Sequence, residues 1–352
     1  MTPTFSVRTF IKSSPSKNFP EVSVVVCHHK GEFIFDFVDS ALKSKDVRIE
    51  VIVVTSDPHL ATQGIRGCRT VYETGGPAKK RNTGYRVAYG QYLAFFDDDV
   101  TIWPTCIREL LTCLRENTQC KMVYGKLFNM EHTKRFDEAG GYLTQTGFIW
   151  SRAEQNVEDV GQFNERVTIL AGKSASCMID ADVFAEVGQF DEDFEILGEE
   201  TDLSWRVWLA GWTVIFEPKA KGYHAFNTKF KPAKEYYTSK RVHFNGCRNY
   251  ITMLIKNLEG SNLWRILPIH TAVWCFAGLA MIITLKIPQG VNIFRGLIYI
   301  LWNLPKILDK RRRIQERKKI SDRELMPLIS RRPSWSYYKG RITRYIGIGL
   351  HG

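Results

Sequence analysis

Three adjacent carboxylates follow a short apolar run in the first third of this chain. In the stretch LAFFDDDVTIWP, residues 93–96 lead directly into Asp97, Asp98 and Asp99. Two carboxylates about 4 Å apart repel each other by roughly 1 to 4 kcal/mol, depending on the local dielectric. A buried strand that ends in three of them therefore needs a positive partner, and Mg²⁺ or Mn²⁺ is commonly held in this way. An exposed acidic turn without a ligand is the alternative interpretation.

A second acidic group occurs in the stretch GEETDLSWR, which we expect to be helical. On a helix, Glu199, Asp202 and Arg206 lie along one face, so Asp202 and Arg206 can form a structural pair. Glu200 points elsewhere and stays available to a reacting group. His224 follows a strand later in the chain, where a lone histidine is either a metal ligand or a structural residue.

The elements that must position these residues alternate between strands and helices. Apolar, β-branched runs at 21–29 and 49–57 flank a segment of helical periodicity, which predicts a β-α-β unit. The run RTVYE precedes GGPAKKRNTGYRVAYG, where two glycines and Pro77 open a helix, and QYLAFF follows as a strand. Such alternation predicts a mostly parallel sheet, whose ligands lie beyond the carboxyl ends of its strands. The acidic triplet is at such an end.

The middle of the chain is less regular. KMVYGKLF and ASCMIDADVF are expected to be strands, joined by a polar segment of about 45 residues that should contain elements of its own or form a mobile lid. ILGEETDLSWRVWLAGW predicts a helix that ends near Gly211, and TVIFEP predicts the strand after it. Cys106, Cys113 and Cys120 recur every seven residues and are expected near one face of a helix. The eight cysteines lack zinc spacing, so we expect reduced, mostly buried thiols in a cytosolic setting.

The positive charge of the chain is concentrated at its C-terminal end. Residues 260–352 hold 17 Lys and Arg against 4 Asp and Glu, whereas residues 1–259 hold 32 against 33. Residues 266–285 carry no formal charge and are long enough to cross a bilayer as a helix. The next apolar run, 290–304, is too short to cross, and a basic stretch suited to anionic headgroups follows it. We expect this end in or on a membrane; a helical hairpin buried within the fold is the alternative, because Pro268 and His270 fit a spanning helix poorly.

Five motifs occur in a characteristic order: VSVVVCHHK, GGPAKKRNTG, LAFFDDDV, VGQFDEDFEILGEETDLSWRVWLAGW and GYHAFNT. In this order they resemble the family 2 inverting glycosyltransferases over about residues 20–250. The resemblance implies the GT-A, or nucleotide-diphospho-sugar transferase, fold. That fold is a Rossmann-like mixed, mostly parallel sheet flanked by helices. It also implies a nucleotide-diphosphate sugar donor and a divalent cation, Mn²⁺ or Mg²⁺.

The resemblance divides the chain into four parts and assigns roles to its polar residues. We expect a tail at 1–20 without a secretory signal, the GT-A catalytic domain at 21–260, apolar membrane-associated helices at 261–305 and a basic tail at 306–352. The implied metal ligands are Asp97, Asp99 and His224. The implied donor-binding residues are Asp57, Gly76, Arg81, Asn82, Asp97 and Asp98.

Two positions depart from the family pattern. The usual catalytic base is the second acid of a Glu-Asp motif, and here that acid is Glu200, with Glu199 as the alternative. Family members often carry Asp directly after the second strand to bind the nucleobase, where this chain has Thr55 and, two residues later, Asp57. Lys79 and Lys80 either contact the donor or are simply solvated.

The apolar C-terminal helices resemble those of rhamnosyltransferase-type members, which implies a lipid-linked glycan acceptor at the cytoplasmic face of the cell membrane. A soluble or protein acceptor, with the C-terminus as an anchor only, is the alternative enzyme. A basic nucleic-acid-binding protein is a distant alternative, because the main domain is nearly neutral, and we expect no nucleic-acid partner. A nonenzymatic sensor of nucleotide sugars would not need Glu200 beside the donor.

Overall fold

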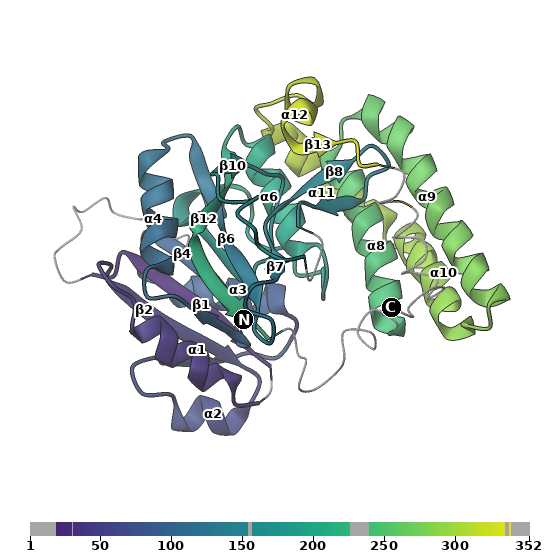
Figure 1. Cartoon of the computed structure of the whole chain (residues 1–352). Helices are drawn as coiled ribbons and strands as arrows, with labels where there is room; N and C mark the ends of the chain where they lie inside the picture. Colours follow the sequence, from purple (N-terminus) through teal and green to yellow (C-terminus); the bar gives the residue numbers. More distant parts are fainter. Residues whose placement is uncertain (1–18, 30, 154–156, 226–238, 335–337, 339–352) are drawn as a thin grey trace, which may run out of the picture.

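A central sheet covered by helices on both faces forms the main body of the molecule, and a group of helices lies to one side of it (Figure 1). The computed structural model describes residues 19–29, 31–153, 157–225, 239–334 and 338. The expected N-terminal tail therefore lies almost wholly outside the described residues, as do parts of the expected basic tail and the end of the GYHAFNT motif.

The N-terminal half of the sheet is parallel, as the sequence predicts. Its strands pair in the order β4-β1-β2-β3, and Val22 of β1 is aligned with Ile49 of β2 and Tyr92 of β4. The elements are β1 (Val22–His28), α1 (Phe33–Leu42), β2 (Ile49–Thr55), α2 (Pro58–Gln63), β3 (Arg69–Tyr72), α3 (Pro77–Val87) and β4 (Tyr92–Asp97).

The C-terminal half of the sheet is mixed. Beyond β4 the order continues β11-β6-β12-β10; β11 runs antiparallel to both of its neighbours, while β6 and β12 run in the direction of β4. The carboxyl ends of β1, β2, β4 and β12 therefore share one edge. The elements are β5 (Val100–Ile102), α4 (Cys106–Glu116), β6 (Cys120–Asn129), β11 (Ser176–Asp180), α5 (Ala181–Glu186), α6 (Glu199–Leu209) and β12 (Thr213–His224).

Two details of the sequence prediction are wrong here. The strand expected over ASCMIDADVF ends at Asp180, because the Asp180 carboxylate accepts from the Asp182 and Val183 N–H groups and thereby caps α5. Cys120 is not on the helix with Cys106 and Cys113, since α4 ends at Glu116 and Cys120 begins β6. All eight cysteines are free thiols, as expected.

The polar segment in the middle of the chain has elements of its own, which was one of the two expectations for it. They are β7 (Phe136–Glu138), β8 (Gly141–Thr144), β9 (Ile149–Ser151) and β10 (Val167–Thr168). β7 pairs with β6 and β10 pairs with β12, so the segment extends the main sheet. β8 forms a small second sheet with β9 and with β13 (Ser330–Arg331) from near the C-terminus.

Both faces of the main sheet are apolar, which is why its strands lack the alternation of a half-exposed sheet. Val24 and Val26 of β1 lie in a core with α1 and α4, whereas Val25 lies in a core with α3, α5 and α6. A Cβ atom at Gly84 of α3 would lie 2.3 Å from Val25 Cγ1, so only glycine allows this close approach of helix to strand.

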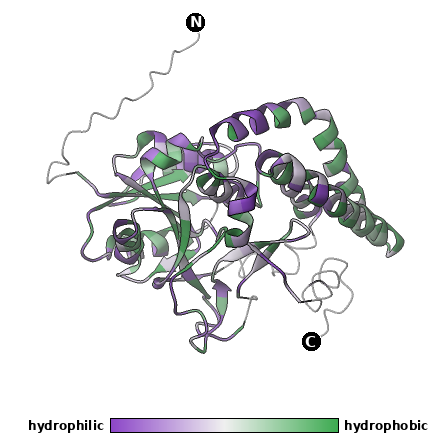
Figure 2. Ribbon diagram, turned by 90° about the horizontal axis from the view of Figure 1, so that it is seen from above, coloured by the Kyte–Doolittle hydropathy of each residue, from purple (hydrophilic) through white to green (hydrophobic). Residues whose placement is uncertain are grey.

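The helices at the side of the domain are α8 (Lys240–Asn257), α9 (Gly260–Ile283), α10 (Ile287–Trp302), α11 (Leu304–Arg317) and α12 (Asp322–Ile329). Most of the α9 and α10 ribbon is hydrophobic (Figure 2). Among the described residues, α9 is the single helix whose length and apolar composition would allow it to cross a membrane, which alone is weak evidence. The basic stretch expected in the tail partly docks on the domain, because Lys310 of α11 pairs with Asp191 and Asp193.

Candidate functional site

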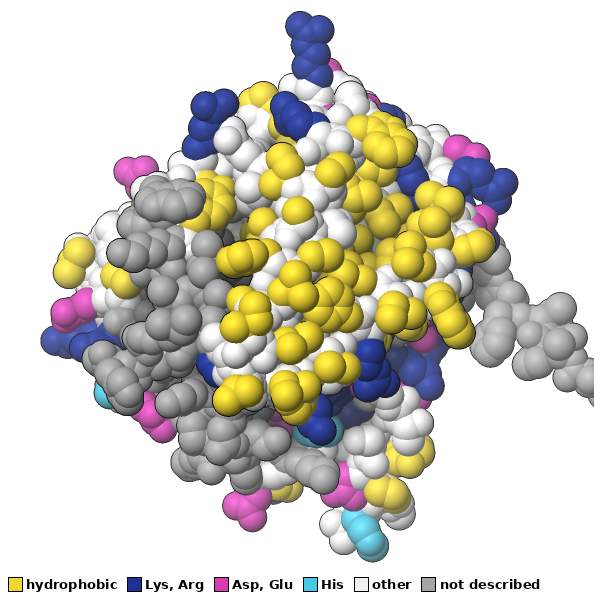
Figure 3. Space-filling view, turned by 90° about the vertical axis from the view of Figure 1, so that its right-hand side faces the viewer, with side chains coloured by type: hydrophobic (Ala, Val, Ile, Leu, Met, Phe, Trp, Pro, Cys, Tyr) yellow, Lys and Arg dark blue, Asp and Glu magenta, His cyan; other side chains and the backbone are white. Residues whose placement is uncertain are grey.

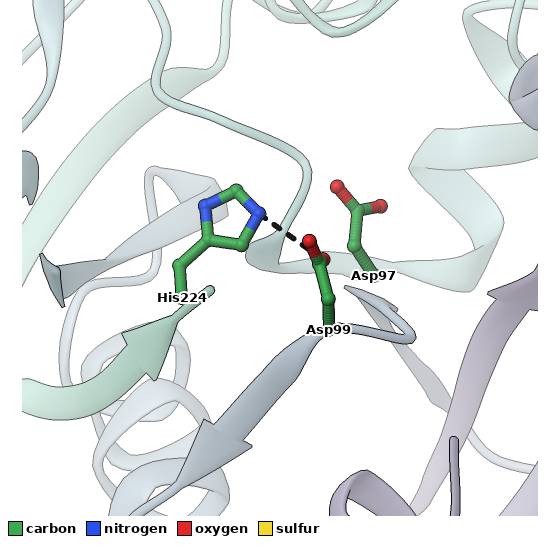
Figure 4. Close-up of side chains that lie close together, drawn as sticks. All are labelled: Asp97, Asp99 and His224. Carbon is green, nitrogen blue, oxygen red and sulfur yellow. Dashed lines mark ion pairs between the residues drawn. The ribbon is translucent and has the colours of Figure 1, made fainter. Parts of the chain in front are cut away.

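The acidic triplet lies at the shared carboxyl edge, close to His224. Asp97 ends β4 and Asp99 precedes β5, which pairs antiparallel with the end of β12. The Ala225 N–H donates to the Asp99 carbonyl at 2.9 Å, so this pairing brings His224 Nε2 to within 3.2 Å of Asp99 Oδ1. Figure 4 shows Asp99 between His224 and Asp97. Strand pairing thus assembles residues that are 125 positions apart in the chain.

The three side chains fit a divalent cation. One ligand atom each from Asp97, Asp99 and His224 lies within 4.8 Å of the other two. Two carboxylates and an imidazole are a suitable donor set for Mn²⁺ or a similar ion. Asp99 and His224 are also buried, so their positions are fixed by packing. The structure thus brings together the three side chains that the sequence analysis names as metal ligands, in an arrangement consistent with a divalent cation. Their binding of an ion stays a prediction.

A buried carboxylate orients His224 from behind. Asp137 Oδ2 lies 2.7 Å from His224 Nδ1, and Lys173 Nζ lies 2.6 Å from Asp137 Oδ1. Metal-binding histidines commonly donate their second ring N–H to such a carboxylate, which directs the other nitrogen at the ion. Burial alone would lower the pKa of His224, but Asp137 and Asp99 outweigh it and raise that pKa to about 10. A cation at this site therefore competes with a proton on His224.

Arg81 joins the acidic triplet to the second acidic group. Its Nη2 lies 2.8 Å from Asp97 Oδ1, and its Nη1 lies 3.0 Å from Glu199 Oε1. The side chain is 2% exposed, and the carboxylates of Asp97 and Glu199 raise the pKa of Arg81 even though burial opposes the charge. This guanidinium holds the first turn of α6 beside the metal ligands.

Glu199 is buried, whereas Glu200 is partly exposed as a residue although its carboxyl group lies largely within the protein. Burial raises the pKa of Glu200 well above its usual range, and the neighbouring Glu199 carboxyl raises it further. The turn before α6 is left-handed at Leu197 (φ 70°) and Gly198 (φ 85°). Asn249 of α8 holds this turn by donating to the Ile196 and Leu197 carbonyls at 2.8 Å. A strained turn that is held in this way positions a side chain firmly.

The sequence of the chain matches two profiles of glycosyltransferase families. The sequence profile described as Glycosyl transferase family group 2 matches residues 92–305, which is more than half of the chain. The chain belongs to this family. A second profile, Glycosyl transferase family 2, matches residues 23–135 of the glycosyltransferase and covers the strands that carry the acidic triplet. The family predicted from the ordered motifs is confirmed.

Curated relatives of the glycosyltransferase are identical to it at about a quarter of the positions in the matched part of the chain. Putative polypeptide N-acetylgalactosaminyltransferase 10 of Drosophila melanogaster is 23% identical over 233 residues, and polypeptide N-acetylgalactosaminyltransferase 14 of Homo sapiens is 24% identical over 234 residues. The matches cover 59% and 60% of this chain but 36% and 42% of those proteins. The glycosyltransferase thus spans about two fifths of the length of these relatives.

The predicted GT-A fold is also confirmed. The solved structure of the mannosyltransferase PcManGT from Pyrobaculum calidifontis, in complex with GDP-Man and Mn²⁺, superposes with a TM-score of 0.50 at 15% identity. The match covers 82% of this chain and 88% of that chain. At this identity the likeness concerns the arrangement of strands and helices.

The predicted donor-binding residues of the glycosyltransferase line the same edge but are largely occupied by protein partners. Asp57 caps α2 by accepting from the His59 and Leu60 N–H groups. Asn82 Nδ2 donates to the Phe190 carbonyl at 3.0 Å, which ties α3 to the loop after α5. Their contacts with a donor stay predictions.

Gly76 and Asp98 lie at the same edge. Gly76 begins α3, and a Cβ atom there would lie 2.7 Å from the Glu195 carbonyl oxygen, so glycine is required at this contact. Asp98 accepts from the His29 N–H at 2.9 Å. Burial, with the charges of Asp99 and Asp97 adding to it, raises the pKa of Asp98 to about 7. The donor contacts expected of both residues likewise stay predictions.

Lys79 and Lys80, which were expected either to contact the donor or to be solvated, differ in their burial. Lys80 is buried, and its Nζ donates to the His28 carbonyl at 2.7 Å and to Ser56 Oγ at 3.3 Å, so it links the ends of β1 and β2. Lys79 is 43% exposed and pairs with Glu73 at 2.8 Å. The solvated alternative is therefore wrong for Lys80.

Asp137 and Lys173 are not among the site residues predicted from the sequence, although both lie at the centre of the site. Asp137 is on β7, and β6 lies between β7 and β12, so the pairing of three strands places Asp137 beside His224. The motif FDEAGG gave no local signal, since its function depends on a strand pairing that spans 87 residues of sequence. The Asp202–Arg206 pair predicted as structural is confirmed at 3.0 Å.

Proposed function

We propose that this protein transfers a sugar from a nucleotide-diphosphate sugar to a hydroxyl group of an acceptor, with inversion at the anomeric carbon. The supporting observation is the Arg81 bridge, which holds the first turn of α6 beside Asp97. A base and a diphosphate-binding cation site have to be neighbours in a single in-line displacement. The closeness of the first turn of α6 to Asp97 supports this arrangement.

Glu200 is the proposed general base. It removes the proton of the acceptor hydroxyl as the oxygen attacks the anomeric carbon and the bond from that carbon to the diphosphate oxygen breaks. Glu199 is less suited to this role, because its carboxylate is buried on Arg81. A raised pKa makes the Glu200 carboxylate a stronger base toward the acceptor hydroxyl.

Asp97, Asp99 and His224 are the proposed ligands of Mn²⁺ or Mg²⁺. A bound cation would neutralise the diphosphate and make it a better leaving group. Asp137 would keep the Nε2 atom of His224 available to such an ion, and Lys173 holds Asp137 in place. The Mn²⁺ in the solved mannosyltransferase supports the choice of metal for a shared fold.

The proposed acceptor is a lipid-linked glycan at the cytoplasmic face of the membrane. The supporting observation is the exposed apolar surface of α9 and α10, which would keep the active site close to a membrane-confined substrate. A soluble or protein acceptor is the competing proposal, and the acceptors in the names of the curated relatives favour it.

A donor screen tests the transfer reaction. The full chain is incubated with Mn²⁺ and nucleotide sugars of the uridine, guanosine and thymidine classes, and both slow hydrolysis and thermal stabilisation are measured. We expect one class to stabilise the protein and to be hydrolysed. Lack of any response in all classes would contradict the proposal.

Glu200→Gln tests the assignment of the base. It should lower the transfer rate by about 10²- to 10⁴-fold while donor-induced stabilisation persists. Glu165→Gln is the matched control, because Glu165 is an exposed glutamate in the loop before β10. Transfer by Glu200→Gln at the rate of the unmodified protein would exclude this base.

A further inference from the structure

The outer surface of the α9–α10 hairpin is an unusually apolar part of the protein. Figure 3 shows yellow side chains gathered over these two helices, with dark blue ones at the edge of the patch. Trp264 and Trp302 are 80% and 83% exposed at one end of the hairpin, and Leu285 is 83% exposed at its tip. The other members are Ile269, Val273, Phe276, Leu279, Ile283, Ile287, Val291, Ile298 and Leu301. A contiguous apolar surface of this kind marks an interaction site.

The inner face of α9 is fixed to the catalytic domain at the middle of the helix. His270 Nδ1 lies 2.8 Å from the Thr146 carbonyl, and Trp274 Nε1 donates to His270 Nε2 at 2.9 Å. The His270 ring packs on Phe148 with centroids 4.1 Å apart. A helix that crossed the bilayer would have to carry this catalytic-domain loop into the hydrocarbon core. The contacts of His270 therefore argue against an α9 that spans the membrane, even though the length and composition of α9 permit a span.

α10 is fixed in a similar way to α8. A Cβ atom at Gly296 would lie 3.0 Å from the Phe244 carbonyl, so the two helices are in close contact. Arg248 of α8 donates to the Asp193 carbonyl, which keeps α8 bound to the domain. Ile293 and Ile300 of α10 are buried beside Ile251 of α8. The hairpin thus lies along the domain and leaves one long side exposed.

The charges on the hairpin are all of one sign. Between Gly260 and Pro305 the charged residues are Arg265, Lys286 and Arg295, and no Asp or Glu occurs. Arg295 is exposed in the middle of α10, where a spanning helix would bury a charge in hydrocarbon. A helix that lies in the membrane plane lets such a side chain reach the headgroups instead.

We propose that the outer face of the α9–α10 hairpin lies in the plane of an anionic lipid bilayer, as a one-sided attachment that does not cross the membrane. The exposed tryptophans suit the boundary between headgroups and acyl chains. The cations suit anionic phospholipids. Two copies that paired hairpin to hairpin would bring these cations together without any hairpin carboxylate to balance them. The proposal goes beyond sugar transfer, and membrane binding and catalysis can each fail without the other.

Vesicle flotation of the full chain tests the attachment. Vesicles of phosphatidylcholine alone are compared with vesicles that also contain phosphatidylglycerol, and we expect binding to the anionic vesicles. Phe276→Glu and Leu279→Glu should each weaken this binding by about tenfold or more, since each removes apolar surface from the bilayer. The matched control is Val160→Glu, because Val160 is an apolar residue that is 80% exposed outside the hairpin.

Charge variants and the oligomeric state separate the possible partners. Lys286→Gln and Arg295→Gln should each weaken binding to anionic vesicles by about fivefold and leave binding to neutral vesicles unchanged. Absence of vesicle binding, or equal binding by the hairpin variants and the unmodified chain, would overturn the proposal. So would a dimer in solution that Phe276→Glu dissociates, without any affinity for vesicles, because a second copy would then cover the face.

Labelling from one side of a membrane distinguishes attachment from spanning. In cells that express the chain, Thr284→Cys places a thiol at the exposed hairpin tip, and Thr62→Cys marks the catalytic domain. Membrane-impermeant maleimide is applied to spheroplasts and to inverted vesicles, with the unmodified chain as the background. We expect both thiols to react from the same side. Reaction of residue 284 from the opposite side would show a spanning hairpin and overturn the proposal.

Discussion

Two clusters of charged side chains, most of them buried or half-buried, have opposite balances of acids and bases. Among the described residues, the edge cluster has six acids, Asp97, Asp98, Asp99, Asp137, Glu199 and Glu200, with four bases, Lys80, Arg81, Lys173 and His224. The scaffold cluster joins α6, α8 and α11 and has three acids, Asp191, Asp193 and Asp202, with four bases, Arg206, Lys256, Lys306 and Lys310.

The opposite balances of acids and bases distinguish a structural cluster from a functional one. In the scaffold cluster every carboxylate pairs with a side-chain cation. Lys256 pairs with two of them, with Asp191 at 2.5 Å and with Asp202 at 2.9 Å. In the edge cluster the acids exceed the bases, so protons or a metal must supply the missing charge. Burial first, and then the neighbouring carboxylates, raise the pKa values of Asp98 and Glu200, so without a cation both groups hold a proton more tightly than usual. Glu200 has to lose that proton before it can act as the base. A charge imbalance at a sheet edge is thus a physical sign of function.

The largest expected effect concerns the scaffold cluster. Lys256→Met leaves Asp191 and Asp202 buried without their shared cation, and we expect a loss of about 3 to 5 kcal/mol in the free energy of unfolding, measured with denaturant. Lys43→Met is the control, since the Lys43–Asp39 pair is exposed and should contribute about 1 kcal/mol or less. Mn²⁺ should not restore the stability of Lys256→Met. Restoration by Mn²⁺ would show that the scaffold cluster also binds cations.

The next effect concerns metal binding by the edge cluster. Mn²⁺ at about 100 times its dissociation constant should stabilise the folded protein by about 2.7 kcal/mol, and a chelator should reverse this. Asp99→Ala should abolish the shift in thermal unfolding because it removes a ligand. Asp46→Asn is the control, as Asp46 is an acid with a 71% exposed side chain far from the triplet in sequence. An unchanged shift in Asp99→Ala would place the ion elsewhere.

A smaller effect is expected one contact away from the ion. Asp137→Asn should weaken Mn²⁺ binding by about 10- to 100-fold, because the amide holds His224 less firmly in the tautomer that presents Nε2. Calorimetric titration of the metal into the full chain measures this without any sugar transfer. If Asp137→Asn binds Mn²⁺ as tightly as Asp46→Asn, the Asp137 contact is only structural.

The smallest effect is a pH-dependent change in stability at Glu200. Its raised pKa means that the folded state holds this proton more tightly than the unfolded state does. The associated stability is present below the usual glutamate pKa of about 4.3 and is lost as the pH rises through the higher folded pKa. Glu200→Gln should therefore unfold at a higher temperature than the unmodified chain at neutral pH, but not at acidic pH. A pH-independent difference would contradict the raised pKa.

Prediction from the sequence succeeded where the signal is local and failed where a contact is distant. The parallel β1–β4 unit and the start of α3 follow from β-branched runs and from the Gly75–Gly76–Pro77 turn. The role of Lys80 stayed open in the sequence, because a lysine on a helix is usually solvated, whereas in the structure this side chain reaches the carbonyl of His28 on β1. Asp57 was expected to face a ligand, but an acid directly before Pro58 also makes a strong helix cap.

The sequence alone determines three features of this protein: the alternating elements, the acidic triplet and the apolar C-terminal segment. Each of them depends on neighbouring residues and on backbone periodicity. Only the tertiary structure decided that Asp137 stands behind His224, that Arg81 joins Asp97 to Glu199, and that α9 is clamped at its middle. These contacts connect residues tens to more than a hundred positions apart. Strand pairing and helix packing create such contacts. A local pattern of residue types does not predict which distant residues will be in contact.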